Sequence, residues 1–455
     1  MRRGSAQTRR RICIPSYAKR AGMSLPDYSD LYARFRQCSA ASTDSRQPQS
    51  NTLFFALNGP SFRGATFAPQ ALAQGARYAV VDDAAVAALD PARYVLVPDT
   101  LEALQQLALH HRRQLTMPVV AITGSNGKTT TKELVYAVLS RRFRVQYTRG
   151  NLNNHIGVPL TLLSIDAAQH DIAVVEMGAN HQGEIAFLCG LAEPSHGLIT
   201  NIGKAHLEGF GGAEGVAKGK GEMFRYLAAS GGTAFVNTAD ARIPGIAEAV
   251  AQRVSYPNPT DTYPAALLAA DPHVSLQLFD GTQVEARITG AYNFPNLAAA
   301  AAVGAHFGVP TADIAAGLAG YDPTNNRSQL VRTSRNEVIL DAYNANPSSM
   351  AAAVTSLAAR PGDNARKAVL LADMFELGEE SAAEHQALGE LIAEQGFGTV
   401  VLIGPEMQRA VQPGFQHFIT KDEAAAWLQA HPLQNQQVLV KGSRGMGLET
   451  LMQLL

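Results

Sequence analysis

The segment VVAITGSNGKTTTKELVYAVLS, residues 119–140, constrains the fold more than any other part of the sequence. An apolar, β-branched run precedes a glycine turn, and a helical apolar pattern follows Gly-Lys-Thr. The N-terminus of a helix presents unpaired N–H groups, which bind phosphate. Gly124 and Gly127 allow the backbone to turn and to approach an anion closely. The segment therefore predicts a strand, a phosphate-binding loop and a helix in a domain that binds a nucleoside triphosphate.

The loop has the short form G-x-x-G-K-T, because Ile122 stands where the general pattern has its first glycine. Lys128 is expected to reach the outer phosphates, and the hydroxyl of Thr129 to coordinate magnesium. An ordinary helix start with a threonine cap is the simpler alternative, but the strand before the loop and the helix after it favour the nucleotide site. The predicted nucleotide-binding residues of the loop are Gly124, Ser125, Asn126, Gly127, Lys128, Thr129 and Thr130.

The composition narrows the function classes. A chain of 455 residues exceeds what one hydrophobic core usually serves, so two or three domains are expected. A net charge of −1 with 17% charged residues argues against nucleic-acid binding through bulk charge. Cys13, Cys38 and Cys189 lack metal-ligand spacing and fit a reducing compartment, and no apolar run has the length of a membrane span. We expect a cytoplasmic protein without nucleic-acid binding or membrane insertion, and a monomer is the working expectation.

The first 22 residues form a basic extension with seven Lys or Arg and no acidic residue. Such a segment is typical of a transit peptide or of a nucleic-acid-binding arm. An equally weighted alternative is that translation starts at Met23 and that the extension is a gene-start artefact. Residues 1–22 are accordingly expected to be disordered or not translated.

Apolar runs alternate with helical stretches along the rest of the chain, which predicts an α/β fold. We expect domains at residues 23–114, 115–325 and 326–455, the last two joined by the turn-rich linker YDPTNNRSQ. In the central domain, short apolar strands separated by helices predict a mostly parallel sheet. Between residues 253 and 290 the alternation has period two, and Asp280-Gly281 predicts a hairpin with a two-residue loop.

The expected strands are TLFFAL, YAVV and YVLV in the first domain, PVVAIT, DIAVVEMG, HGLITNIG and TAFVN in the second, and NEVILDAYNANP, KAVLLADM, TVVLIG and QVLVKG in the third. The expected helices include LEALQQLALHHRRQ, AEGVAKGKGEMFRYL and FPNLAAAAAVGAHFG. The C-terminal KGSRGMG is not a dinucleotide-binding loop, because its glycine spacing differs and too few residues follow for a βαβ unit.

Three residues downstream of the phosphate loop are candidates for catalysis. Glu176 ends the apolar run DIAVVEMG, at the edge of a sheet where α/β proteins place ligands. His206 follows another strand and can ligate a metal, although a lone histidine is more often structural. Lys220 lies within the predicted helix AEGVAKGKGEMFRYL. Taken by itself, it is expected to be a solvated surface lysine.

Nine ordered motifs give the chain, from about residue 42 to its end, a resemblance to a known family. They are TGSNGKTTTKE, GNLNNHIGVPLTLL, EMGANHQGEIA, TNIGKAHLEGFG, GVAKGKGEMF, GAYNFPNLAAA, DAYNANPSSM, DMFELGEE and VLVKGSRGMG. In this order they resemble the Mur ligases of peptidoglycan synthesis, in the branch that joins D-alanyl-D-alanine to UDP-N-acetylmuramoyl-tripeptide.

The resemblance implies an α/β fold with three domains: a small domain for the uridine nucleotide, a central phosphate-loop ATPase with a mostly parallel sheet, and a Rossmann-like C-terminal domain that closes over the site. It implies that ATP phosphorylates the terminal carboxylate of the tripeptide. The amine of D-alanyl-D-alanine then attacks the acyl phosphate and releases phosphate. The expected cofactors are ATP and two magnesium ions.

By the same resemblance, the catalytic residues are Lys128, Glu176, His206 and Lys220. Thr129 and Glu176 hold one magnesium ion, and His206 with a carbamylated Lys220 serves a second; Lys218 is out of register. Asn293 and Asn296 match asparagines beside the adenine. Without the resemblance, a helix N-cap is an equally weighted alternative for Asn293. Arg327 and Asp341 match contacts to phosphate and ribose, and the sequence shows no partner for Asp341.

The implied substrate-binding residues are Ser45 and Arg46 for the uridine nucleotide, the muramoyl motif Asn153, Asn154 and His155, and the C-terminal Tyr343, Asn344, Asn346, Lys441, Ser443 and Arg444. Four positions depart from the family pattern. Arg63 and Ala65 replace an acid and a histidine, Ala372 replaces a glycine, and Ala342 replaces a polar residue. None of the four lies in the phosphate loop or among the proposed cation ligands.

Two alternatives remain within the ligase class: a ligase that adds the third amino acid, and a folylpolyglutamate-type ligase. The tetrad DNPR, usual in relatives that add diaminopimelate, is absent. A non-catalytic nucleotide-binding scaffold is the alternative from another class, but such a scaffold is expected to have lost Glu176, His206 or Lys220.

Overall fold

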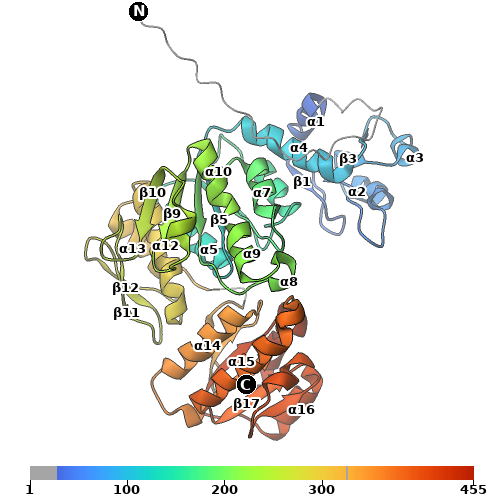
Figure 1. Ribbon diagram of the computed structural model, residues 1–455. Helices are drawn as coiled ribbons and strands as arrows, with labels where there is room; N and C mark the ends of the chain where they lie inside the picture. Colours follow the sequence, from blue (N-terminus) through green and yellow to red (C-terminus); the bar gives the residue numbers. More distant parts are fainter. Residues whose placement is uncertain (1–27, 324–325) are drawn as a thin grey trace, which may run out of the picture. The chain divides into compact units, whose positions relative to one another are not determined.

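The computed structural model describes residues 28–323 and 326–455 (Figure 1). The predicted basic extension, Met23 and part of the predicted linker therefore lie outside the described residues. Contacts divide the chain into two compact units, Met1–His111 and Arg112–Leu455. The predicted boundaries near residues 114 and 325 stay predictions. None of the helices among the described residues is both long and apolar enough to cross a membrane.

The first unit is built on a four-stranded parallel sheet in the order β1-β2-β3-β4. Its strands are β1 Ala40–Ser42, β2 Thr52–Phe55, β3 Tyr78–Val81 and β4 Tyr94–Leu96. Its helices are α1 Tyr28–Phe35, α2 Ala68–Ala73, α3 Ala84–Ala87 and α4 Thr100–Arg113. The three predicted strands are confirmed as β2 to β4, and their apolar side chains form a core with those of η1 Gly64–Phe67 and α2. The partly exposed β1 was not predicted, because Ala-Ala-Ser has no apolar pattern.

The second unit contains a six-stranded sheet in the order β10-β9-β8-β5-β7-β6, with every neighbouring pair parallel. Its strands are β5 Val119–Thr123, β6 Val145–Tyr147, β7 Ile172–Glu176, β8 His196–Ile199, β9 Thr233–Asn237 and β10 Gln252–Tyr256. The predicted parallel sheet is confirmed. The period-two alternation predicted from residue 253 is present in β10, where Val254 and Tyr256 are buried and Arg253 is exposed, and this strand completes the parallel sheet.

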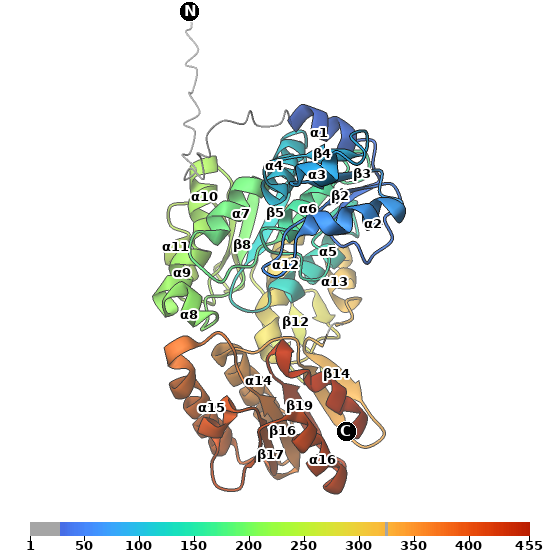
Figure 2. The same cartoon turned by 90° about the vertical axis from the view of Figure 1, so that its right-hand side faces the viewer.

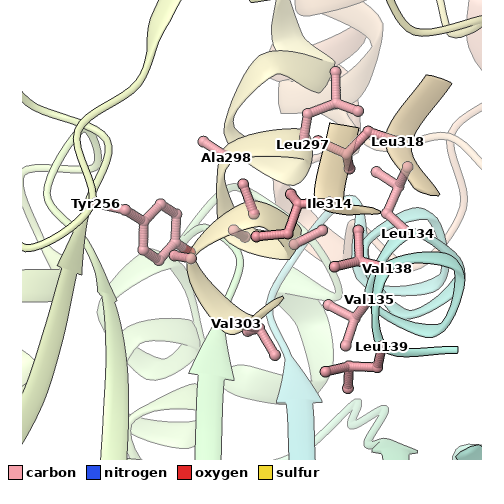
Figure 3. Close-up of a cluster of buried hydrophobic side chains, with 14 of the residues drawn as sticks. Leu134, Val135, Val138, Leu139, Tyr256, Leu297, Ala298, Val303, Ile314 and Leu318 are labelled. Atoms are coloured by element: carbon pink, nitrogen blue, oxygen red, sulfur yellow. The ribbon is translucent and has the colours of Figure 1, made fainter. Parts of the chain in front are cut away.

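Helices α5, α12 and α13 pack together against this sheet and bury the main core of the unit (Figure 3). The helices of this region are α5 Lys128–Leu139, α6 Gly157–Leu163, α7 Glu184–Ala192, α8 Leu207–Phe210, α9 Ala213–Lys220, α10 Glu222–Ser230, α11 Ile243–Ile246, η2 Ala291–Asn293, α12 Phe294–His306 and α13 Thr311–Ala319. The helical structure predicted over AEGVAKGKGEMFRYL is confirmed as two helices, α9 and α10, which are separated at Gly221.

A small antiparallel sheet, β11 Ala266–Ala269, β12 Ser275–Gln277 and β13 Gln283–Glu285, covers part of the same core. The predicted hairpin is confirmed, but its two-residue loop is wrong. The Leu278 amide donates to the Thr282 carbonyl, so residues 279–281 form a three-residue loop. Gly281 has φ +91°, the left-handed conformation that such a loop requires at its last position.

A second six-stranded sheet, in the order β14-β15-β19-β16-β17-β18, forms the C-terminal part of the unit (Figure 2). Its strands are β14 Gln329–Arg332, β15 Glu337–Asp341, β16 Lys367–Ala372, β17 Thr399–Ile403, β18 Gln416–Phe418 and β19 Gln437–Lys441. Its helices are α14 Pro347–Ala359, α15 Ser381–Gln395 and α16 Lys421–Ala430, with short 3-10 helices at Asn364–Arg366, Gly378–Glu380, Glu406–Ala410, Arg444–Met446 and Leu448–Leu454.

The four strands predicted for this C-terminal sheet are confirmed as β15, β16, β17 and β19, and their pairings with one another are parallel. Only the edge strand β14 runs antiparallel, against β15. The KGSRGMG segment leads from β19 into short 3-10 helices, so no βαβ unit follows it, as predicted. The architecture is α/β, and separate apolar clusters fill the first unit, the central region and the C-terminal sheet.

Candidate active site

The carboxyl ends of three adjacent strands bring the central motifs to one edge of the sheet. Strand β5 lies between β7 and β8, with Ile122 in register with Glu176 on one side and Leu198 on the other. The phosphate loop follows β5, Glu176 ends β7, and the segment TNIG follows β8. This edge is where open α/β sheets bind ligands.

The two glycines of the loop are required by both conformation and space. Gly124 has φ +142° and Gly127 has φ +76°, values that side chains other than glycine rarely adopt. A Cβ on Gly124 would lie 2.0 Å from Thr200 Oγ1, and a Cβ on Gly127 would lie 2.5 Å from Asn296 Oδ1. The loop can therefore hold this shape only with glycine at both positions.

The segment after β8 holds the loop in place. Ser125 Oγ accepts from the Gly203 amide at 2.8 Å, and the Asn126 amide donates to Asn201 Oδ1 at 3.0 Å. The Thr200 hydroxyl donates to the Asn126 carbonyl at 2.6 Å. Thr200 and Asn201 were not predicted, although their place at the end of a strand beside the loop was a usable signal.

Lys128 turns back over the loop. Its Nζ donates to the carbonyls of Gly124 at 2.9 Å and Ser125 at 3.1 Å. Burial lowers the pKa of Lys128 to about 8; the charge of Glu176 opposes this shift, and that of Arg327 adds to it. The loop thus carries an ammonium group at its centre, with a guanidinium group in electrostatic range. Thr130, which follows Thr129 in the first turn of α5, is buried.

Thr129 and Glu176 meet as predicted. Glu176 is 1% exposed, and its Oε1 accepts from Thr129 Oγ1 at 3.1 Å and from Asn153 Nδ2 at 2.7 Å. Glu176 Oε2 is also buried but has no hydrogen-bond partner among the described residues. A buried carboxylate oxygen that accepts no hydrogen bond, beside a hydroxyl group, fits a hard cation such as magnesium.

His206 and Lys220 make no direct contact with each other in the described residues. Lys220 ends α9 and is 1% exposed; its Nζ donates to the Ala179 carbonyl at 3.0 Å. Burial lowers the pKa of Lys220 well below its usual value, and the charge of Lys128 adds to the shift. Nδ1 of His206 lies 2.5 Å from Oε2 of Glu376, a residue of the DMFELGEE motif. The shared cation of His206 and Lys220 stays a prediction.

Asn293 and Asn296 form a buried hydrogen-bonded chain behind the phosphate loop. Asn293 Nδ2 donates to the Thr289 carbonyl at 2.8 Å, and Asn296 Nδ2 donates to Asn293 Oδ1 at 2.9 Å. Asn296 Oδ1 accepts from Thr131 Oγ1 on α5 at 3.1 Å. The N-cap alternative for Asn293 is wrong as regards its side chain, which makes no capping hydrogen bond to α12.

Two arginines from separate motifs flank Tyr343 near the C-terminal sheet. The guanidinium carbon of Arg327 lies 3.6 Å from the centre of the tyrosine ring, and that of Arg444 lies 5.2 Å from it. Arg327 Nε is buried and has no hydrogen-bond partner among the described residues, which suits a group that binds phosphate.

Asp341 has the partner that the sequence did not reveal. It pairs in register with Lys441 on the neighbouring strand, and its Oδ2 lies 2.6 Å from Lys441 Nζ. The same ammonium group donates to the Asn344 carbonyl at 3.2 Å. Ser443 is buried, and its Oγ accepts from the Phe375 amide at 3.1 Å.

Asn346 has two structural contacts. Its side chain forms a capping box with Ser349 at the start of α14. Its Nδ2 also donates to Asn126 Oδ1 in the phosphate loop at 2.7 Å. The predicted substrate role of Asn346 therefore has a structural alternative.

The remaining predicted substrate residues lie on loops. Asn154 Oδ1 accepts from the amides of Ile156 and Gly157, just before and at the start of α6, and His155 is exposed. In the first unit, the exposed Arg46 is bound to Asp44 through both side-chain oxygens, and Ser45 lies between these two residues. Of the departures in that unit, Arg63 is exposed and Ala65 is buried.

Three models of the Mur ligase family match the chain. The model of the family's catalytic domain matches residues 39–112, the Mur ligase middle domain matches 122–304, and the glutamate ligase domain matches 326–444. Two curated relatives carry the name UDP-N-acetylmuramoyl-tripeptide–D-alanyl-D-alanine ligase. The one from Escherichia coli is 37% identical over 91% of this chain and 93% of its own. The one from Bacillus subtilis is 35% identical over 90% and 91%.

Solved structures agree with these relatives. MurF from Acinetobacter baumannii superposes with a TM-score of 0.83 at 34% identity, covering 94% of this chain and 97% of its own. MurF from Thermotoga maritima, solved in complex with ADP, gives 0.79 at 26% identity, covering 93% and 97%. The fold is thus the three-domain α/β fold of these ligases. By its motifs, its family models and its relatives, the chain belongs to the Mur ligase family.

Proposed function

We propose that this protein is an ATP-dependent amide ligase that joins D-alanyl-D-alanine to UDP-N-acetylmuramoyl-tripeptide. The observation that carries the proposal is the double contact of Glu176, whose Oε1 accepts from Thr129 of the phosphate loop and from Asn153 of the muramoyl motif. The carboxylate of Glu176 thus contacts both the loop proposed to bind ATP and the motif proposed to bind the muramoyl-tripeptide. The curated relatives of the same length carry this activity in their names.

The proposed reaction has two steps. An oxygen of the tripeptide's terminal carboxylate attacks the γ-phosphorus of ATP, which forms an acyl phosphate and releases ADP. The amine of D-alanyl-D-alanine then attacks the acyl carbon, loses a proton, and expels phosphate as the amide bond forms. Both reacting groups of the first step are anions, so the site must neutralise charge and fix their geometry.

Lys128 and the loop amides supply part of that neutralisation. The ammonium group of Lys128 now rests on the carbonyls of Gly124 and Ser125, from which it can turn to a bound phosphate. The helix α5 begins directly after the loop, so its N-terminal amides point toward the same anion. Arg327, with its unpaired buried Nε, adds a second positive group for phosphate.

Thr129 and Glu176 are proposed to hold the magnesium ion of the nucleotide, because Glu176 Oε2 is buried and accepts no hydrogen bond among the described residues, next to the Thr129 hydroxyl. When bound, this ion would offset the negative charge of the phosphates and the carboxylate.

For a second ion, we propose His206 with Lys220 as a carbamate. Burial favours the neutral amine of Lys220, which is the form that adds CO₂ to give a carbamate and a proton.

The C-terminal residues are proposed to complete the nucleotide and acceptor sites. Arg327 and Asp341 would contact phosphate and ribose, while Asn293 and Asn296 would lie beside the adenine. Lys441 bonds to Asp341 and Asn344, and Arg327 and Arg444 lie over the ring of Tyr343. We propose that Tyr343, Asn344, Lys441, Ser443 and Arg444 bind the substrate. Ser45 and Arg46 would engage the uridine nucleotide. The protein is further proposed to act as a monomer in the cytoplasm.

An assay of phosphate release tests the function. Purified protein is given ATP, magnesium, UDP-N-acetylmuramoyl-tripeptide and D-alanyl-D-alanine, and each component is omitted in turn. Release that requires all four, with the pentapeptide as product, supports the proposal. Release with a single amino acid or a folate as substrate, without the tripeptide, would favour the other ligase types. No release under any condition would favour a nucleotide-binding scaffold.

A further inference from the structure

Lys132 is a fully buried lysine beside the site to which neither the sequence motifs nor the proposed reaction gives a role. It lies on α5, three residues after Thr129, and its side chain is 0% exposed. Its Nζ lies 3.0 Å from Glu133 Oε1 and 3.8 Å from Glu176 Oε2, and it donates to the Gly150 carbonyl at 3.2 Å. A buried ammonium group with two carboxylates and a carbonyl around it is a costly arrangement unless all its partners stay in place.

These contacts join three segments that are distant in sequence. Lys132 belongs to the phosphate-loop helix, Glu176 ends β7, and Gly150 lies in the loop 148–155 that carries the muramoyl motif. The same loop also bonds directly to Glu176: Asn153 Nδ2 donates to Glu176 Oε1, and the Thr148 hydroxyl accepts from the Glu176 amide. Lys132 therefore approaches the Glu176 oxygen that Thr129 and Asn153 leave unoccupied.

At Gly150 the bond from Lys132 goes to the backbone carbonyl. Gly150 has φ +54°, and no atom lies within 4 Å of the position that a Cβ would take. Among the described residues, no side chain packs on this side of Gly150, and the bond from Lys132 fixes its carbonyl. The rest of the loop is held by further bonds, such as that from the Gly178 amide to the Asn153 carbonyl. A charge-assisted hydrogen bond is among the stronger single contacts that can fix a loop.

We propose that Lys132 is a positioning residue that ties the substrate loop 148–155 to the cation-side carboxylate Glu176, so that the muramoyl-peptide is held in register with the nucleotide. The proposal rests on the proposed function. Because its side chain is fully buried, Lys132 touches neither substrate and acts through the Gly150 carbonyl and Glu176. Its loss would loosen the tripeptide site while leaving the glycine-built phosphate loop in shape.

Lys367 provides a matched control. It is another buried lysine, 1% exposed, and its Nζ donates to the carbonyls of Ala358 and Arg360 in the C-terminal region. Lys132→Met and Lys367→Met remove the same chemical group from two buried positions, each with backbone carbonyl acceptors, and only Lys132 also faces carboxylates. A general effect of losing a buried ammonium group would appear in both variants, whereas an effect on substrate placement would appear in one.

The experiment measures the KM for UDP-N-acetylmuramoyl-tripeptide, and the Kd for ADP with magnesium, in the wild type and both variants. For Lys132→Met we expect the KM to rise about 10- to 100-fold while the Kd changes less than about threefold. Lys367→Met should leave both constants near their wild-type values. Lys132→Arg keeps a charged donor, so its KM for the tripeptide should lie between those of Lys132→Met and the wild type.

Each outcome has a distinct meaning. An unchanged KM in Lys132→Met, or an equal change in the tripeptide KM and the nucleotide Kd, overturns the positioning role. The same pattern in Lys367→Met overturns it as well. If Lys132→Met fails to fold in a thermal denaturation control, Lys132→Arg carries the test, and a nucleotide-only defect there overturns the role. A wild-type protein without tripeptide-dependent turnover refutes the proposed function itself, which separates the two failures.

Discussion

The hydroxyl group of Thr129 donates a 3.1 Å hydrogen bond to Oε1 of Glu176, linking the first turn of the phosphate-loop helix to the end of the adjacent strand. The pair lies where the carboxyl ends of β5 and β7 meet. It leaves Glu176 Oε2 buried and without a hydrogen-bond partner among the described residues, which suits a bound cation.

The first prediction concerns the charge of Glu176. Glu176→Gln keeps the side-chain volume and the hydrogen bonds from Thr129 and Asn153 but removes the negative charge. We expect kcat/KM to fall about 100-fold or more, with weaker magnesium dependence of nucleotide binding. Steady-state kinetics and titration of ADP with and without magnesium measure this. Glu390→Gln, on the exposed side of α15, is the matched control; equal activity in both variants would contradict the cation site.

The second prediction concerns the modification of Lys220. Lys220→Ala should abolish turnover at low magnesium, whereas Lys218→Ala, an exposed change on the same helix, should leave it intact. Intact-protein mass spectrometry under mild conditions should find the mass of one added CO₂ in the wild type and none in Lys220→Ala. Wild-type rates in Lys220→Ala, or a modification that persists in it, would refute the carbamate.

The third prediction separates the two contacts of Asn346. Asn346→Ala removes the capping box of α14 and should lower the free energy of unfolding by about 1 kcal/mol. Asn346→Ser keeps a capping oxygen but is too short to reach Asn126, so its stability should stay near that of the wild type. Urea denaturation together with steady-state kinetics checks both variants. If Asn346→Ser is fully active, the residue is a helix cap and not a substrate contact.

The fourth prediction concerns the dependence of stability on pH. Burial, with a further contribution from the charge of His306, lowers the pKa of His196 to about 4. In the unfolded chain this histidine takes up a proton near pH 6.5, whereas in the folded protein it stays neutral until about pH 4. Above pH 6.5 the ring is neutral in both states, so the contribution of His196 to the free energy of unfolding is fully present. It is lost as the pH falls toward 4. At about pH 5 we expect a loss of roughly 1–2 kcal/mol relative to pH 8.

Urea denaturation at the two pH values measures this loss in three proteins. His196→Phe should flatten the profile, because an aromatic ring remains against Phe235 and Phe307 but cannot take up a proton. His431→Gln, at an exposed position, should behave as the wild type does. A profile of His196→Phe that matches the wild type would contradict the assignment.

Much of the fold was predictable because its strands are buried on both faces. Apolar runs such as those of β5, β7 and β16, whose residues are all buried, stand out in the sequence. The short β1 and the edge strands β14 and β18, with no fully buried residue, give no such signal. The loop of the hairpin was misjudged because Asp-Gly occurs in two-residue and three-residue loops alike, and only the partner of Leu278 decides between them.

The candidate site was predictable where its chemistry is local. The phosphate loop is read from one continuous segment, and Glu176 from its place at a strand end. The role of Lys132 depends instead on contacts between segments that are distant in the chain, so no local pattern marks it. The pairing of Asp341 with Lys441 is of the same kind, because it requires the order of strands β15 and β19.

The most direct test of the central claim follows one oxygen atom. UDP-N-acetylmuramoyl-tripeptide labelled with ¹⁸O in its terminal carboxylate is incubated with the protein, ATP, magnesium and D-alanyl-D-alanine, and the released phosphate is analysed by mass spectrometry. Phosphorylation of the carboxylate predicts that each released phosphate carries one peptide oxygen and that the pentapeptide amide keeps the other. Unlabelled phosphate, or labelled phosphate without pentapeptide, would contradict an acyl-phosphate ligase.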